Sequence, residues 1–221
     1  MKIKTIILGT TGMVGEGVLH ECLKHPDVEA VLLINRRPGG ITHEKVQEII
    51  HQDFNDLSPI ADQLTGYNAC YFCMGISSVG VTADTYQKIT YDLTMHVANT
   101  LVKNNPDMTF CYVSGVGTDS TEKGRSRWAR VKGKTENDLL KLPFKAACMF
   151  RPGYIQPTKG LNNSYKIYKI FMPFYPLLAG LFPKYFGTME ELGLAMINAV
   201  LKGSDKKVLE PPDIRELAKG E

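Results

Sequence analysis

The stretch "SRWARVKGK", residues 126–134, holds residue types whose spacing could do chemistry. In a helix, Trp128 and Lys132 lie at positions i and i+4, so their side chains share one face. The ammonium of Lys132 could work in a cofactor site, whereas the indole N–H of Trp128 donates hydrogen bonds and supplies no transferable proton. The stretch is an active site, a cofactor site that has lost its acid, or a basic helix.

A second candidate is the glycine pattern "GTTGMVG", residues 9–15, which stands between a strand-like run and a helical pattern. In a dinucleotide-binding loop, Gly9 allows the tight turn, Gly12 lets backbone approach a pyrophosphate, and Gly15 lets helix and strand pack closely. The N–H groups at the helix start then face the phosphates. The pattern predicts a cofactor loop whose contacts come from Gly9, Thr11, Gly12, Met13, Val14 and Gly15.

The next strand-like run ends in "NRRP", residues 35–38. An NAD site usually has Asp or Glu about 20 residues past the glycine loop, where the carboxylate binds the ribose 2′-hydroxyl. Here Asn35 is neutral and is followed by Arg36 and Arg37, whose guanidinium groups suit a 2′-phosphate. The sequence therefore favours NADP over NAD, the alternative being a solvated arginine pair.

The elements that position these residues alternate between strand-like and helical patterns, which is typical of a parallel α/β sheet. We expect an α/β doubly wound parallel sheet (Rossmann) in the order 3-2-1-4-5-6 with a small C-terminal cap. Residues 1–157 would form the dinucleotide-binding core, and residues 158–221 a C-terminal substrate or cap segment of the same domain. Strands are predicted at 3–8, 29–35, 45–50, 69–74, 108–114 and 145–151, and helices at 12–24, 83–103, around 126–134 and at 189–203.

Composition bounds the partners and the setting. The 221 residues carry a formal net charge of +3, which is too small to argue for nucleic acid, although residues 123–134 hold six Lys or Arg and no acid. The five cysteines have no metal-ligand spacing, and we interpret Cys70 and Cys73 as buried strand cysteines rather than a redox pair. The N-terminus lacks a signal-peptide pattern, so we expect a reducing, cytoplasmic setting.

The apolar stretch "IFMPFYPLLAGLFP", residues 170–183, has 14 residues without a charge. It is shorter than the roughly 20 apolar residues that a membrane-spanning helix needs, and prolines interrupt it. We expect it to cover a substrate cleft or to form a homodimer contact. Attachment to a membrane surface is the less favoured alternative.

Several motifs occur together in the right order and with the right spacing: "TIILGTTGMVGEGVL" (5–19), "NRRP" (35–38), "QDF" (52–54), "CMGISS" (73–78), "YVSGVG" (112–117), "WARVKGKTE" (128–136) and "RPGYIQP" (151–157). By these motifs the chain resembles the short-chain dehydrogenase/reductase superfamily. More narrowly, it looks like the atypical, epimerase-like members, including the Tat-interacting-protein branch. The resemblance spans residues 3 to about 157 and is diffuse afterwards.

The resemblance implies further cofactor contacts. Asp53 would accept a hydrogen bond from the adenine amino group, with Phe54 beside it. Gly75 and Ile76 would pass along a ribose of the cofactor. Residues 152–155, with Pro152 and Ile155 at their ends, would flank the nicotinamide.

The superfamily's chemistry uses a Ser, a Tyr and a Lys, and this chain departs from it at the central residue. Ser114 and Lys132 match, but Trp128 stands where the Tyr is expected, and Tyr154 is the candidate substitute acid. The resemblance implies an NADP-dependent oxidoreductase or epimerase-like enzyme on a small carbonyl or hydroxyl substrate. The alternative is a non-catalytic NADP(H)-binding regulatory or scaffold protein.

Overall fold

The computed structural model describes residues 1–161, 163, 180–182 and 184–220. Its centre is a seven-stranded sheet in the order β3-β2-β1-β4-β5-β6-β9, in which every neighbouring pair is parallel. The predicted order of the first six strands is confirmed, and a seventh strand extends the sheet beside β6. The strands are β1 (Ile3–Leu8), β2 (Val28–Asn35), β3 (Val46–Ile50), β4 (Ala69–Phe72), β5 (Thr109–Val113), β6 (Ala146–Phe150) and β9 (Val208–Leu209).

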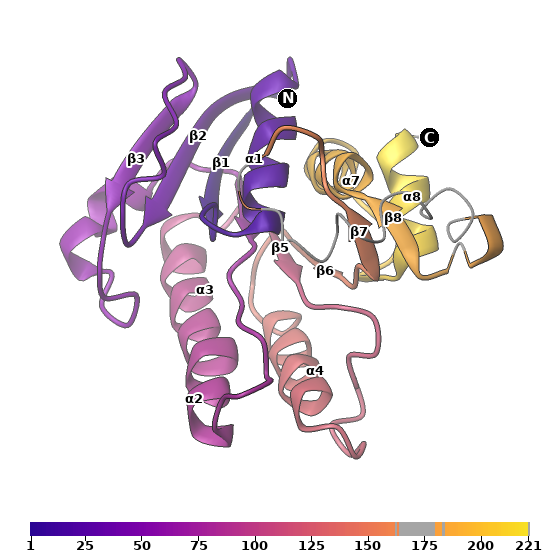
Figure 1. The fold of residues 1–221 in the computed structure, drawn as a ribbon. Helices are drawn as coiled ribbons and strands as arrows, with labels where there is room; N and C mark the ends of the chain where they lie inside the picture. Colours follow the sequence, from indigo (N-terminus) through magenta and orange to yellow (C-terminus); the bar gives the residue numbers. More distant parts are fainter. Residues whose placement is uncertain (162, 164–179, 183, 221) are drawn as a thin grey trace.

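Helices cover both faces of this sheet, as the doubly wound class requires. One face carries α1 (Met13–Lys24), α7 (Met189–Leu201) and α8 (Pro211–Lys219), and the other carries α3 (Leu93–Asn104), α4 (Arg127–Leu139) and the 3₁₀ helix at Ser58–Leu64. Figure 1 shows α1 beside α7, with α3 and α4 together on the opposite side. The central strands are continuous apolar runs because they are buried between these two layers: all four residues of β4 and all five of β5 are buried.

The helix predicted at 83–103 is interrupted by a wider turn. It runs as α2 (Ala83–Gln87), a π-helical segment (Lys88–Asp92) and α3. Single π turns inside helices often accompany functional sites. Here the widened turn carries Ile89, which lines the groove described below.

The C-terminal segment contributes more than a cap. The short pair β7 (Tyr154–Gln156) and β8 (Phe186–Thr188) leads into α7, whose first turn is fixed by a capping box between Thr188 and Glu191. Helix α7 packs tightly on α1, because a Cβ at Gly17 would lie 2.0 Å from Cγ of Met189. A division of the chain near residue 157 stays a prediction.

The stretch 170–183 lies largely outside the described residues, so the cleft, homodimer and membrane-surface interpretations remain predictions. Leu181 and Phe182 within it, and Tyr185 just after it, are exposed. Within the described part of the chain, no helix combines the length and apolar character needed to cross a membrane.

Candidate functional site

The glycine loop has the geometry of a phosphate cradle. Gly9 has a φ of +90°, and a Cβ there would lie 2.8 Å from the backbone of Cys73 and Met74. A Cβ at Gly15 would lie 2.2 Å from the carbonyl oxygen of Gly9, so α1 packs against the loop at a distance that only glycine permits. Gly12, by contrast, is the N-cap of α1. A Cβ there would lie 3.4 Å from its nearest neighbour, the carbonyl oxygen of Gly9. Gly9 and Gly15 are therefore needed for the shape of the loop. Gly12 has no such close contact and leaves space beside the N-terminus of α1.

A groove of about 390 Å³ runs from this loop along the carboxyl ends of β1, β2 and β4. It lies where doubly wound sheets bind ligands, at the point where the strand order reverses. The predicted residues that line it are Gly9, Thr11, Gly12, Arg36, Asp53, Phe54, Gly75 and Ile76. Sequence reasoning missed other lining residues, including Asn35, Gln52, Asn55, Cys73, Met74, Ile89 and Leu93.

At the end of β2, a polar network replaces the acid of an NAD site. The Asn35 side chain is buried, accepts a hydrogen bond from Thr10 Oγ1 at 3.0 Å, and donates one to Glu48 Oε1 at 2.7 Å. Glu48 comes from β3 and also accepts from the Gly39 N–H at 2.9 Å. A carboxylate therefore does lie beside this strand end, but two hydrogen bonds hold it. The parallel register of β2 and β3 brings it there, which no linear motif shows.

The two arginines after Asn35 differ in position. Both are exposed, but Arg36 lines the groove and Arg37 is absent from its lining. The Arg36 carbonyl accepts a short hydrogen bond from the Gln52 side chain, which ties this turn to the loop after β3. The structure therefore separates two residues that the sequence treats as a pair.

The adenine-contact residues implied by the resemblance lie on that loop after β3. Asp53 is exposed, and its Oδ1 accepts from the Asn55 N–H at 2.9 Å, which holds the loop in a tight turn. Phe54 is buried and anchors the loop to the core beneath it. Asp53 thus keeps a carboxylate at the groove while Phe54 fixes its position.

Lys132 is buried on α4 and is not among the residues that line the groove. Its Nζ donates to the Val113 carbonyl at 3.1 Å and lies 5.1 Å from the Tyr112 ring centroid. The same nitrogen is 3.8 Å from the position that a Cβ on Gly75 would occupy, so it reaches the end of β4. Burial lowers the Lys132 pKa from 10.5 to about 8, and the nearby Glu136 carboxylate partly opposes this shift.

Trp128 lies one turn before Lys132 on α4, as its spacing predicts. The side chain is half-buried, and its ring carbon Cη2 is 3.4 Å from the position of a Cβ on Gly117. The ring therefore packs against the loop that follows β5, the strand after which Ser114 comes.

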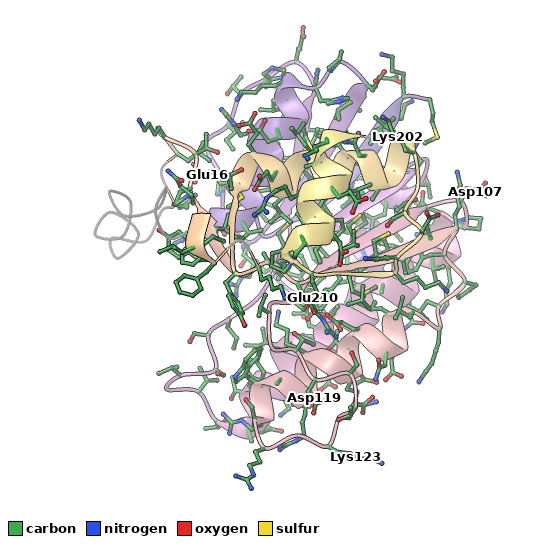
Figure 2. The ribbon with its side chains drawn as sticks, turned by 90° about the vertical axis from the view of Figure 1, so that its right-hand side faces the viewer. Glu16, Asp107, Asp119, Lys123, Lys202 and Glu210 are labelled. Carbon is green, nitrogen blue, oxygen red and sulfur yellow. The ribbon has the colours of Figure 1, made fainter. Side chains whose placement is uncertain are left out.

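Ser114 is tied to an ion pair beneath the site. Its Oγ is 2.5 Å from Glu136 Oε1, and Glu136 is fully buried. Both carboxylate oxygens accept from Nε of Arg151, at 3.1 and 3.2 Å. Arg151 in turn contacts Ser120 and Glu210. Figure 2 shows Glu210 where the C-terminal helix meets the rest of the chain, above the loop that carries Asp119.

The nicotinamide-flanking residues implied by the resemblance are not among the residues that line the groove. Residues 152–155 line a separate small cavity with residues of α7 and α8. The Tyr154 ring packs on Phe186 with centroids 5.3 Å apart, and burial raises the Tyr154 pKa. Ile155 belongs to the core. The structure does not bring Tyr154 to the groove, because pairing with β8 holds its strand to the C-terminal segment.

Cys70 fits the interpretation of a buried strand thiol, whereas Cys73 lies just after β4 and is half-buried. Cys70 and Cys73 are both free, and Cys70 lies inside β4. Cys73 lines the groove, and burial raises its pKa to about 12, so its thiol stays protonated at neutral pH.

A parallel sheet in this order with a glycine-rich turn after its first strand defines a Rossmann-type α/β protein. No family model matches the chain. It is 26% identical over 228 residues to the mitochondrial protein FMP52 of Candida glabrata, covering 100% of this chain and 94% of that protein. It is 27% identical over 151 residues to protein HTATIP2 of Rattus norvegicus, covering 67% of this chain and 61% of that protein.

Among solved structures, the fold is similar to MoeE5 in complex with UDP-glucose and NAD. The TM-score is 0.68 at 13% identity, over 97% of this chain and 80% of that one, which shows a shared fold. The fold and these relatives agree with the resemblance of the motifs to the atypical members of the short-chain dehydrogenase/reductase superfamily.

The expected cytoplasmic setting is wrong. The FMP52 relatives from four species are all named as mitochondrial proteins. Free cysteines and the lack of a signal-peptide pattern do not distinguish the cytosol from other reducing compartments, which is why the inference failed.

Proposed function

We propose that this protein binds NADP(H) in the groove and is an oxidoreductase of the short-chain dehydrogenase/reductase type. Its substrate is a small molecule with a carbonyl or hydroxyl group. The observation that carries the proposal is the single groove joining the open Gly12 cradle, Arg36 at the end of β2 and Gly75 at the end of β4. Its volume is in the range of small-molecule and cofactor sites.

The described residues fit such a cofactor. The N–H groups at the start of α1 and the open face of Gly12 would hold the pyrophosphate, and Arg36 the 2′-phosphate. Asp53 would accept from the adenine, and Lys132 would hold the ribose next to the nicotinamide. The bound cofactor supplies or accepts a hydride. The chain's residues must position the substrate and handle its proton.

The site lacks an evident general acid to supply a proton to the substrate. General acid–base catalysis typically contributes 10²–10⁴-fold in rate, and Trp128 cannot provide it. Ser114 has no ionisation near neutral pH, and Tyr154 faces the C-terminal segment. This observation favours one second candidate, a protein that binds NADP(H) for regulation and does not turn it over.

A titration with NADPH and NADH tests cofactor binding. Trp128 is the only tryptophan of the chain, so NADPH should change the intrinsic fluorescence as calorimetry records binding. The proposal would be refuted if calorimetry detected binding of neither NADPH nor NADH. Binding without a fluorescence change would place Trp128 outside the site.

Substitution of Trp128 separates the two candidates. If the remaining groups are competent, Trp128→Tyr should create or raise NADPH-dependent reduction of small carbonyl compounds, by about 10²-fold or more. Trp128→Phe is the matched control, because it has the ring without the hydroxyl. Binding of NADPH with no turnover in either variant would favour the regulatory role.

A further inference from the structure

We infer that a pair of side chains on neighbouring strands, Asn35 at the end of β2 and Glu48 on β3, sets the choice between NADP and NAD. Residue 35 alone does not set it. The consequence for cofactor choice rests on the proposed function, whereas the pairing rests on the hydrogen bonds of the chain. Glu48 is absent from the lining of the groove, so it acts as a positioning residue through Asn35.

The Asn35 amide lines the groove, yet both of its ends have partners within the chain. The residue is only 3% exposed. Its Nδ2 donates to Glu48 Oε1 at 2.7 Å, and its Oδ1 accepts from Thr10 Oγ1 at 3.0 Å. A carboxylate oxygen accepts hydrogen bonds, so the amide nitrogen must be the atom that faces Glu48. The amide therefore ties the glycine loop, to which Thr10 belongs, to β3.

Glu48 also holds the turn that carries Arg36. Its Oε1 accepts from the Gly39 N–H at 2.9 Å. A Cβ on Gly39 would lie 3.1 Å from that oxygen and 3.5 Å from Asn35 Nδ2, so the backbone of the turn packs directly on the pair. The Gln52 side chain holds the same turn through the Arg36 carbonyl. Because the Arg36 side chain is itself exposed, the position of its guanidinium depends on this turn.

The pair explains why an acid does not fit at position 35. In an NAD site the residue there is Asp or Glu, whose carboxylate accepts from the ribose 2′-hydroxyl. An aspartate in place of Asn35 would bring an oxygen, instead of an N–H group, to Glu48 Oε1, which lies 2.7 Å from the amide nitrogen. Two carboxylates at that distance must share a proton or separate. Glu48 therefore favours a neutral residue at position 35, and a neutral residue does not repel a 2′-phosphate.

The pairing can be tested without cofactor. The melting temperature of Asn35→Asp, relative to that of the unmutated protein, should fall by roughly 3–10 °C between pH 5 and pH 8, because the shared proton is lost as pH rises. The double variant Asn35→Asp with Glu48→Gln should not show this loss. Its glutamine amide can donate to the new carboxylate and still accept from Gly39. His51, whose N–H donates to the Asn35 carbonyl, titrates in every variant and cancels in the comparison.

Calorimetry with NADPH and NADH tests the consequence for cofactor choice. Asn35→Asp should bind NADPH about tenfold more weakly or worse. It should gain less than about threefold for NADH, because its carboxylate is engaged with Glu48. The double variant should bind NADH about tenfold more tightly than Asn35→Asp does, the effect of one charge-assisted hydrogen bond to the ribose.

Glu48→Ala tests the positioning role by itself. It removes the acceptor from both Asn35 and Gly39, so NADPH should bind about tenfold more weakly while NADH changes by less than about threefold. Glu48→Gln, whose side-chain oxygen can accept from the same two groups, should restore the ratio of the two affinities. Gln47→Ala is the matched control, because Gln47 is exposed on the same strand. A role in stability alone would lower both affinities alike.

Three results would overturn the inference. They are a relative melting temperature of Asn35→Asp that does not change with pH, a tenfold gain for NADH in Asn35→Asp alone, and equal losses of NADPH and NADH in Glu48→Ala. An Asn35→Asp protein that fails to fold while the double variant folds supports the pair. If neither folds, Glu48→Ala against Glu48→Gln decides.

The proposed function fails separately. If the unmutated protein binds neither cofactor, the proposed function is refuted, and the consequence for cofactor choice with it. The melting temperatures then still decide whether Asn35 and Glu48 form the pair.

Discussion

At the residue scale, the arginines after β2 should have unequal roles. Arg36 lines the groove and Arg37 does not, although both are exposed. A charge-assisted contact to a phosphate contributes about 1.5–3 kcal/mol. Arg36→Ala should therefore weaken NADPH binding roughly 10- to 150-fold and NADH binding little, with calorimetry as the measurement.

Arg37→Ala is the matched control for this prediction, because it removes the same charge one residue away. Its effect on NADPH should be within about threefold, as expected for a partly screened neighbouring charge. Equal losses in the two variants would mean that general charge, rather than a built contact, governs affinity.

Lys132 should reduce the stability of the fold. Its folded-state pKa of about 8 lies below the ordinary 10.5, so the unfolded chain takes up the proton more readily. The destabilisation is complete below pH 8, falls as pH rises from 8 to 10.5, and is absent above that window. At 1.36 kcal/mol per pKa unit, it amounts to about 3 kcal/mol at most.

Lys132→Met should therefore be more stable than the unmutated protein at pH 7, by roughly 1–3 kcal/mol after loss of the Val113 hydrogen bond. Urea unfolding at pH 7 and pH 10 should show the difference shrinking at the higher pH. The same variant should bind NADPH at least about tenfold more weakly. A variant that is less stable at pH 7 would indicate a structural lysine.

At the element scale, substitution of two glycines of one loop by alanine should have different effects on stability. A Cβ at Gly15 would meet the Gly9 carbonyl at 2.2 Å, so Gly15→Ala must move α1 away from the loop. Overpacking of this kind typically costs 1–3 kcal/mol or more. Gly12→Ala meets nothing closer than 3.4 Å and should cost less than about 1 kcal/mol, as an N-cap change.

Gly12→Ala, which should cost little stability, should nevertheless weaken cofactor binding. Its methyl group would stand on the open face of the cradle, so Gly12→Ala should lose NADPH affinity about tenfold or more while the fold stays intact. Thermal unfolding and calorimetry on both variants measure the two effects. Normal NADPH binding by the Gly12→Ala variant would show that the pyrophosphate does not contact this loop.

At the scale of the whole molecule, one buried ion pair connects both layers and the C-terminal segment. Glu136 comes from α4 on one face, Arg151 follows β6 in the sheet, and Glu210 caps α8 on the other face. Removing one partner of a buried pair leaves an uncompensated charge and typically costs 3–5 kcal/mol. Arg151→Met should therefore destabilise the protein by about that amount in urea unfolding.

Glu210→Gln provides the comparison, because this carboxylate is 43% exposed. Exposed pairs contribute about 0–1 kcal/mol, so this variant should be nearly as stable as the unmutated protein. Equal losses for the two variants would show that the contact to α8, and not the buried pair, determines stability.

The sequence by itself determined the sheet and the glycine loop. Apolar runs buried on both faces indicate strands. Glycine is needed where a Cβ would collide with a neighbouring backbone segment, as at Gly9 and Gly15, and a positive φ such as that of Gly9 favours it further. These are local constraints, so they appear in the order of residues. The spacing of Trp128 and Lys132 on α4 is local for the same reason.

Only the tertiary structure decided which side chains meet. Glu48 reaches Asn35 through strand register, Glu136 reaches Ser114 and Arg151 through helix packing, and β8 draws Tyr154 toward the C-terminal segment. The short strands β7, β8 and β9 have too few residues to show a period, and pairing creates them. Contacts across long stretches of chain depend on the packing of whole elements. The sequence therefore showed a serine, a tryptophan and a lysine, and the fold decided which groups these side chains contact.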